Sequence, residues 1–130
     1  MNNFIYKIVD YINELELGLS LKIGIPDDGE SLVIIPIEGS EVIHEYMNGS
    51  ADIRLPFEIK IKSKNQEEAF NVLSKVMNHM RNIVEVLEKD EKKDHTLLQV
   101  VIDHIPTFVG KEADGYFYYN AKMTVDLAMN

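Results

Sequence analysis

The segment that most constrains the fold of this chain is a strictly alternating run at residues 51–63, ADIRLPFEIKIKS. Every second residue from Ile53 to Ile61 is apolar, and the residues between them are charged or proline. Side chains of a strand point alternately to its two faces, so one face lies on a core and the other meets solvent or a partner. Asn48-Gly49 precedes the run and is a strong turn signal. The sequence therefore predicts a protruding hairpin near residues 41–62.

A proline interrupts this strand. Pro56 has no N–H to donate to a neighbouring strand, which predicts an edge position or a bulge. An edge of this kind is either protected from pairing or used as an interface. Arg54 and Glu58 lie on the same face as Pro56, so we interpret all three as candidate residues of a subunit or partner interface.

Two amphipathic helices are indicated. Apolar residues at spacings of three and four predict one helix over residues 3–17, with Gly18 at its end. The second follows the alternating strand directly. Its start fits two capping boxes, Ser63–Gln66 and Asn65–Glu68, and its apolar face runs from Phe70 to Leu87.

The remaining segments have the length and composition of strands. Besides the alternating run, three predicted strands lie between the helices, at residues 19–26, 31–39 and 41–47. Two more predicted strands follow the second helix, at residues 96–105 and 115–129, and residues 106–115 between them are expected to form a loop. The order is α-β-β-β-β-α-β-β. The fold class is α+β, with a mostly antiparallel sheet and two helices on one face. The length of 130 residues predicts a single domain, 1–130.

Composition narrows the classes of function. The net charge is −9 at pH 7, and no basic stripe is visible that would bind a nucleic-acid duplex. The absence of cysteine excludes disulfides, thiolate catalysis and cysteine-ligated metals. The first residues lack a signal-peptide layout, and no apolar run approaches 18 residues, so we expect no membrane association.

No catalytic constellation is recognisable. The four histidines, His44, His79, His95 and His104, lack the spacing of a zinc-binding helix, and adjacent Asp–His pairs do not form an oriented triad. Phosphate-loop and nucleophile-elbow spacings are also missing. The sequence predicts no catalytic residue, no cofactor or cofactor-binding residue and no metal site, and we expect that the protein is not an enzyme.

The tyrosine-rich segment 116–119 has two interpretations. A surface that stacks nucleobases would need several aromatic rings on one face, with basic residues alongside to bind the phosphates. The sequence indicates neither feature. Alternation instead places Phe117 and Tyr119 in the core and Tyr116 and Tyr118 outside. Tyrosine is enriched at protein interfaces, so Tyr116 and Tyr118 are candidate contact residues; the alternative is simple surface exposure.

The predicted strand at 97–105 is apolar on both faces. Simple alternation divides its apolar residues into two groups: Leu98, Val100 and Ile102, and Leu97, Val101 and Ile105. Strands of this type are covered on both faces. We infer that another subunit covers the second face, with Val101 in the contact; a hairpin or loop of the same chain is the alternative.

Residues 46–80, YMNGSADIRLPFEIKIKSKNQEEAFNVLSKVMNHM, resemble the phage minor capsid protein family, a group similar to the tail terminator proteins of long-tailed phages. The segment 115–129 also resembles the closing strand of that family. The matching residues are Tyr46, Gly49, Leu55, Pro56, Phe57, Glu58, Ile59, Lys62, Ser63, Lys64, Gln66, Asn78 and His79.

The resemblance implies a virion structural protein, assembled in the cytoplasm of a bacterial host. Tail terminators form a ring, commonly a homohexamer, that caps the tail tube and joins it to the head–tail connector. DNA passes through the ring without specific binding. Two alternatives remain: a non-catalytic α+β module that binds a small ligand or a regulator, and a hydrolase that uses His79 or His104 with scattered acids.

Overall fold

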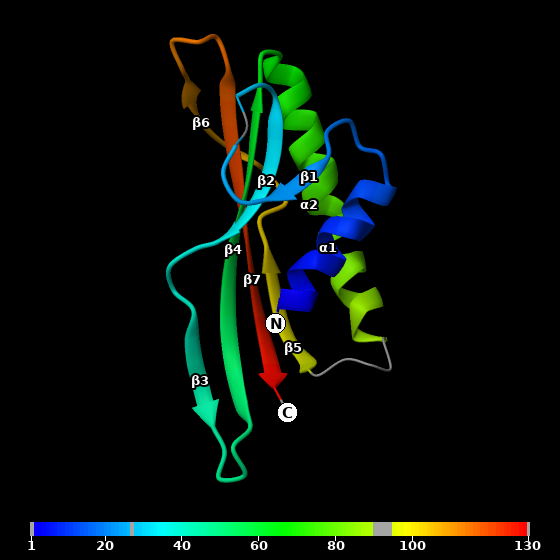
Figure 1. Ribbon diagram of the computed structural model, residues 1–130, viewed down its shortest axis with the longest axis vertical. Coiled ribbons are helices and arrows are strands. Elements are labelled where there is room, and N and C mark those ends of the chain that lie inside the picture. Colours follow the sequence, from blue (N-terminus) through cyan, green and yellow to red (C-terminus); the bar gives the residue numbers. More distant parts are fainter. Residues whose placement is uncertain (1, 27, 90–94, 130) are drawn as a thin grey trace.

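The structure is a computed structural model that describes residues 2–26, 28–89 and 95–129, with the side chains of residues 2–4 and 95 outside the described part. The sequence also indicates a charged connector, EKDEKKDH, at residues 88–95, and this segment falls largely outside the described residues. The α+β class is confirmed, with two helices and a mostly antiparallel sheet (Figure 1). The elements are α1 (Asn2–Glu14), β1 (Leu21–Ile23), β2 (Ser31–Pro36), β3 (Glu41–Glu45), β4 (Ala51–Ser63), α2 (Gln66–Glu88), β5 (His95–Ile102), β6 (Thr107–Lys111) and β7 (Phe117–Met129).

The sheet is built around two long central strands. Its order is β1-β2-β4-β7-β5, with β3 added to β4 and β6 added to β7. β4 and β7 are antiparallel and pair along their full length, from Ala51 opposite Met129 to Ser63 opposite Phe117. β1 and β2 are parallel. Both helices cover the same face of the sheet, as predicted (Figure 1).

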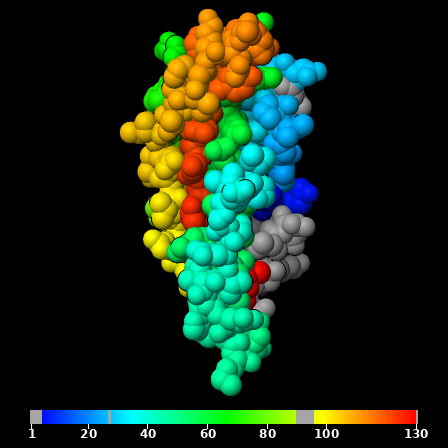
Figure 2. Space-filling model, turned by 90° about the vertical axis from the view of Figure 1, so that its left-hand side faces the viewer, coloured from blue at the N-terminus to red at the C-terminus, as the bar shows by residue number. Residues whose placement is uncertain are grey.

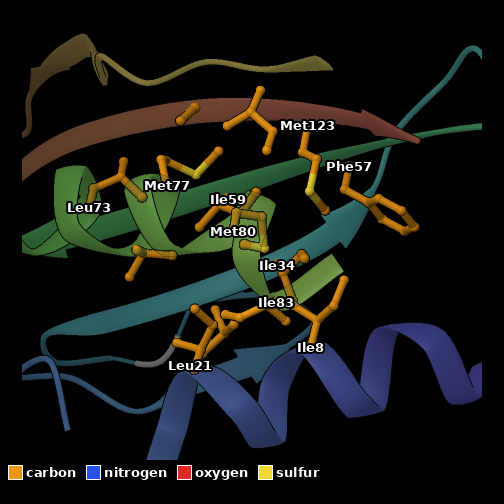
Figure 3. Close-up of a cluster of buried hydrophobic side chains, with 14 of the residues drawn as sticks. Ile8, Leu21, Ile34, Phe57, Ile59, Leu73, Met77, Met80, Ile83 and Met123 are labelled. Atoms are coloured by element: carbon orange, nitrogen blue, oxygen red, sulfur yellow. The ribbon is translucent and has the colours of Figure 1, made fainter. Parts of the chain in front are cut away.

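The core lies between this face and the helices. The alternation predicted for β4 is confirmed, because Leu55, Phe57, Ile59 and Ile61 are buried against the helices. Figure 3 shows how methionines fill the centre, from both α2 and the sheet. The fully buried residues there are Ile34, Ile59, Leu73, Met77, Met80 and Met123.

The start of α2 follows one of the two predicted capping boxes. The Asn65 side chain accepts a hydrogen bond from the N–H of Glu68 at 2.9 Å. The Ser63 hydroxyl accepts the N–H of Asn65 and donates to Glu30 instead of capping the helix. Strand β4 therefore passes into α2 within three residues because side chains satisfy the free backbone donors of the first turn.

The position of Pro56 differs from our prediction, because β4 is a central strand and not an edge. β7 pairs with one side of β4, and β2 and β3 share the other side. The β2 ladder reaches Phe57, and the carbonyl of Pro56 accepts the N–H of Ile37 at 3.1 Å. The N–H and C=O of one residue point to the same side of an antiparallel strand. Pro56 has no N–H to donate towards β2, so the β2–β4 ladder ends at this position, where the chain leaves β2 and continues to β3.

The two faces of β5 also differ from the prediction. A register shift after Leu97 forms a bulge, which alternation does not anticipate. Leu97 now packs on the core, as do Val100 and Ile102, whereas Leu98 is exposed. The strand ends at Ile102, so the second apolar face is reduced to the region of Val101, which is 54% exposed.

The expected loop at 106–115 contains an additional strand. β6 forms a hairpin with β7, with Phe108 opposite Tyr119 and their ring centroids 5.3 Å apart. Tyr119 also packs edge-on against Phe70, at 5.8 Å. This hairpin lies at one end of the long axis of the molecule, and the β3–β4 hairpin protrudes at the other (Figure 1).

Candidate assembly interface

The predicted interface residues all belong to the sheet face that the helices leave open, here called the helix-free face, and Figure 2 looks onto this face. Alternation along β4 and the strand registers place them there. Pro56 is opposite Thr124 on β7, and Thr124 is opposite Val101 on β5. The six residues are Arg54, Pro56, Glu58, Val101, Tyr116 and Tyr118. Whether they contact a partner stays a prediction.

Arg54 is the centre of an ion-pair network that joins three strands. Its guanidinium donates two hydrogen bonds to the carboxylate of Asp126, at 2.9 and 3.1 Å, and a third to Glu41 at 3.1 Å. The hydrogen bonds and charge of Asp126 raise the pKa of Arg54. Asp126 is buried, so this fork-shaped pairing compensates its lost hydration. Arg54 therefore fixes the base of the β3–β4 hairpin to β7.

Glu58 is engaged within the chain as well. Its carboxylate lies 3.1 Å from the ammonium of Lys60 and accepts a hydrogen bond from Asn120 at 3.3 Å. The hydrogen bond to Asn120 joins β4 to β7 across the centre of the helix-free face, and cross-strand polar pairs of this kind stabilise a sheet. Arg54 and Glu58 thus have structural roles that the sequence pattern did not reveal.

A lysine–tyrosine cluster, made of Lys62, Lys64, Tyr116 and Tyr118, occupies one end of the helix-free face. The ammonium groups of Lys62 and Lys64 lie 4.9 and 5.2 Å from the centre of the Tyr116 ring, which is cation–π distance. Tyr118 is opposite Lys62 in the β4–β7 register. Burial, together with the charges of the nearby carboxylates at 112 and 114, raises the pKa of the Tyr118 hydroxyl.

The sequence prediction missed the lysines of this cluster. We expected no basic residues beside the tyrosines, yet the register of β4 with β7 brings Lys62 and Lys64 to them from more than 50 positions away. The alternation of β4 already placed lysines on the outer face. The sequence does not reveal which strand pairs with β4, or in which register.

The β3–β4 hairpin presents a second distinctive surface at the opposite end. We call residues 38–52 the hairpin arm. The Tyr46 hydroxyl donates to the Asp52 carboxylate at 2.9 Å, which raises the pKa of Tyr46, and the His44 ring packs on Tyr46. The turn is stabilised by Asn48, whose side chain accepts the N–H of Ser50, and by Gly49 with φ +90. These contacts fix the conformation of the arm, and its tip is exposed to solvent.

The arm carries exposed apolar side chains. Every residue of β3 is exposed, and β3 pairs with β4 alone among the described strands. Met47, at the turn, is fully exposed. The other large apolar residues that the arm exposes are Val42, Ile43 and Tyr46. Exposed apolar residues gathered on one protruding element are typical of contact surfaces.

An apolar groove opens where β2 and β3 part along β4. The residues that line it include Tyr6 from α1, Ile23 from β1, and Pro56 and Phe57 from β4. Its volume is about 200 Å³. Among the described residues that line it, Ser40 and Tyr6 contribute the polar side-chain groups, so it has few groups that could orient a polar ligand.

The described part of the chain has no candidate metal centre. It contains no group of three or more His, Asp or Glu side chains that could hold a metal ion. His79 lies half-buried in α2, and His104 is exposed in the turn after β5. None of the helices described at residues 2–14 and 66–88 is long and apolar enough to cross a membrane.

The chain matches a known protein family. Residues 9–128 match the model of a bacteriophage tail terminator protein family. The match covers most of the chain, and the chain belongs to this family. The tail-terminator part of the resemblance is therefore confirmed, and the chain has a structural role in a phage tail. The minor-capsid part stays a prediction. No curated protein matches the chain.

Proposed function

We propose that the protein caps the end of a phage tail tube as a closed ring of six identical subunits and joins the tube to the head–tail connector. Membership of the tail terminator family over residues 9–128 carries this proposal. The residues 1–130 act as one domain in the ring, which is assembled in the bacterial cytoplasm and incorporated into the virion. No catalytic step is involved.

The geometry supports a role in assembly. Two hairpins extend from opposite ends of one rigid sheet, and both expose apolar residues, such as Met47 and Val109. A ring needs two different, mutually complementary surfaces on each subunit. The net charge of −9 would let DNA pass through the ring without adhering, because like charges repel.

The test uses the purified protein and tail tubes. Native mass spectrometry over a concentration series, with negative-stain imaging, should reveal one discrete closed oligomer, free or on the tube end. Tube extension should stop when the protein is added. Tubes that extend equally with and without the protein, and carry no cap, would contradict the proposal.

The apolar groove at Pro56 supports the second candidate, a module that binds a small apolar ligand. A thermal-shift screen with apolar metabolites tests it. A ligand that stabilises the wild type but not a Tyr6→Ala variant would favour this candidate. No shift with any ligand would argue against it.

A further inference from the structure

The two ends of the molecule differ in charge. The hairpin arm carries four carboxylates, Glu38, Glu41, Glu45 and Asp52, and no lysine or arginine. The lysine–tyrosine cluster lies at the other end of the long axis, where β4 ends and β7 begins (Figure 1). A nearby third lysine, Lys111, lies 5.2 Å from the centre of the Phe117 ring. The carboxylates of Glu112 and Asp114 lie near Tyr118, so the complementarity to the acidic arm resides in the lysine ammonium groups of the cluster and not in the whole end of the molecule.

Part of this charge is not used within the chain. Glu41 pairs with Arg54, and Asp52 accepts from Tyr46. Glu45, in contrast, is exposed, and its side chain makes no ion pair or hydrogen bond with another described residue. Lys64 is exposed as well, and its described interaction is with the ring of Tyr116. A carboxylate at one end and an ammonium group at the other thus remain available for contact.

The apolar chemistry is complementary too. Met47 is fully exposed beside Glu45 at the tip of the arm. A methionine thioether packs favourably against aromatic rings and adapts to irregular surfaces. The cluster offers the rings of Tyr116 and Tyr118, both partly exposed. The tip therefore presents one carboxylate and one thioether. The cluster presents an ammonium group that can pair with the carboxylate and aromatic rings that can pack against the thioether.

We propose that the hairpin arm of one copy docks on the lysine–tyrosine cluster of the next copy, with Glu45 facing Lys64 and Met47 against the tyrosine rings. The inference rests on the proposed function, which requires contact between copies. The arm cannot reach its own cluster, because the two lie at opposite ends of the same sheet (Figure 1). Each copy uses its arm once and its cluster once, so the contact is head-to-tail and forms a ring if the rotation closes.

A charge swap tests this contact. Glu45→Lys and Lys64→Glu should each raise the concentration of half-assembly about tenfold, because each places like charges together. The double variant should return to within about threefold of the wild type, since the pair is restored in reverse. Matched controls are Glu14→Lys on α1 and Lys75→Glu on α2, both exposed and both expected to assemble normally.

Cross-linking gives a second readout that does not depend on affinity. The chain has no cysteine, so Met47→Cys and Tyr116→Cys introduce unique thiols. A short bis-maleimide should link a mixture of the two single variants into heterodimers, and the double variant into a ladder that ends at the ring size. Lys75→Cys in place of Tyr116→Cys should give no such product with Met47→Cys.

The outcomes separate the inference from the proposed function. If the wild type assembles but the double charge variant is no better than the single ones and no cross-link forms, this contact is wrong and the ring uses other surfaces. If Lys64→Glu weakens retention of DNA but leaves assembly intact, the cluster serves nucleic acid and the inference fails. A wild type that stays monomeric with and without tail tubes overturns both.

Discussion

Replacing Phe57 with alanine is the most direct test of the register of β4. Phe57 is 4% exposed and lies on the core face, opposite Pro36 of β2 and Met123 of β7. Figure 3 shows its ring on the same side of the sheet as Met80 of α2. If β4 were shifted by one residue, this ring would point to the helix-free face. The free energy of unfolding therefore reports directly on which face Phe57 occupies.

The expected loss has two parts. Removing a buried phenylalanine ring forfeits about 2–3 kcal/mol of transfer free energy. A residual cavity of about 50 Å³, at about 24 cal/mol per Å³, adds about 1 kcal/mol. The sum is about 3–4 kcal/mol. The groove beside Phe57 allows some relaxation, which keeps the value at the lower end of the usual range of about 3–5 kcal/mol.

Urea unfolding followed by circular dichroism measures this change. The midpoint should fall while the denaturant slope stays constant, and the melting temperature should drop by roughly 10–15 °C. Phe57→Leu, which keeps most of the volume, should cost less than about 1.5 kcal/mol. Lys60→Ala, on the opposite face, serves as the surface control and should cost less than about 1 kcal/mol. A loss below about 1 kcal/mol for Phe57→Ala would refute the register.

Three further substitutions test other parts of the structure. Tyr118→Asp should leave the monomer folded but weaken assembly in sedimentation experiments, because it adds a carboxylate to the cluster; unchanged assembly would mean that Tyr118 is exposed without a contact. Asn65→Ala removes the N-cap of α2 and should lower the free energy of unfolding by about 1 kcal/mol, whereas Asn65→Asp should restore it. Gly18→Ala places a Cβ 3.3 Å from Val72 on a residue with φ +123, and should lower the free energy of unfolding by about 2 kcal/mol. An unchanged melting temperature in thermal unfolding would contradict this backbone conformation of Gly18.

Local patterns were sufficient where local physics decides the structure. The alternation in residues 51–63 identified the buried face of β4, and the Asn48-Gly49 turn identified the hairpin. One of the two predicted capping boxes, Asn65–Glu68, coincides with the start of α2, where Asn65 is the N-cap. In each case, neighbouring residues in the sequence supply the donors, the acceptors or the buried area.

Features that depend on strand pairing were not predictable in this way. The bulge after Leu97 has no signature in a segment that is apolar on both faces, because either register buries similar side chains. Pro56 was predicted to lie at an edge or in a bulge, because sequence alone does not show that two strands divide one side of β4; no register shift interrupts the pairing of β4 with β2 or with β7. β6 was missed because its short segment is largely exposed and lacks an alternating pattern. Of the interface residues, the sequence indicated the face but not their partners within the chain.

The full-length pairing of β4 with β7 also has a mechanical consequence. Both strands run along the long axis of the molecule, and β4 leads directly to the hairpin arm (Figure 1). A pull on the arm along this axis acts parallel to the strands and perpendicular to the hydrogen bonds between them. The whole ladder, from Ala51 to Ser63, is then loaded in shear at once, instead of opening one bond at a time. A subunit held by its arm would resist tension as a single unit.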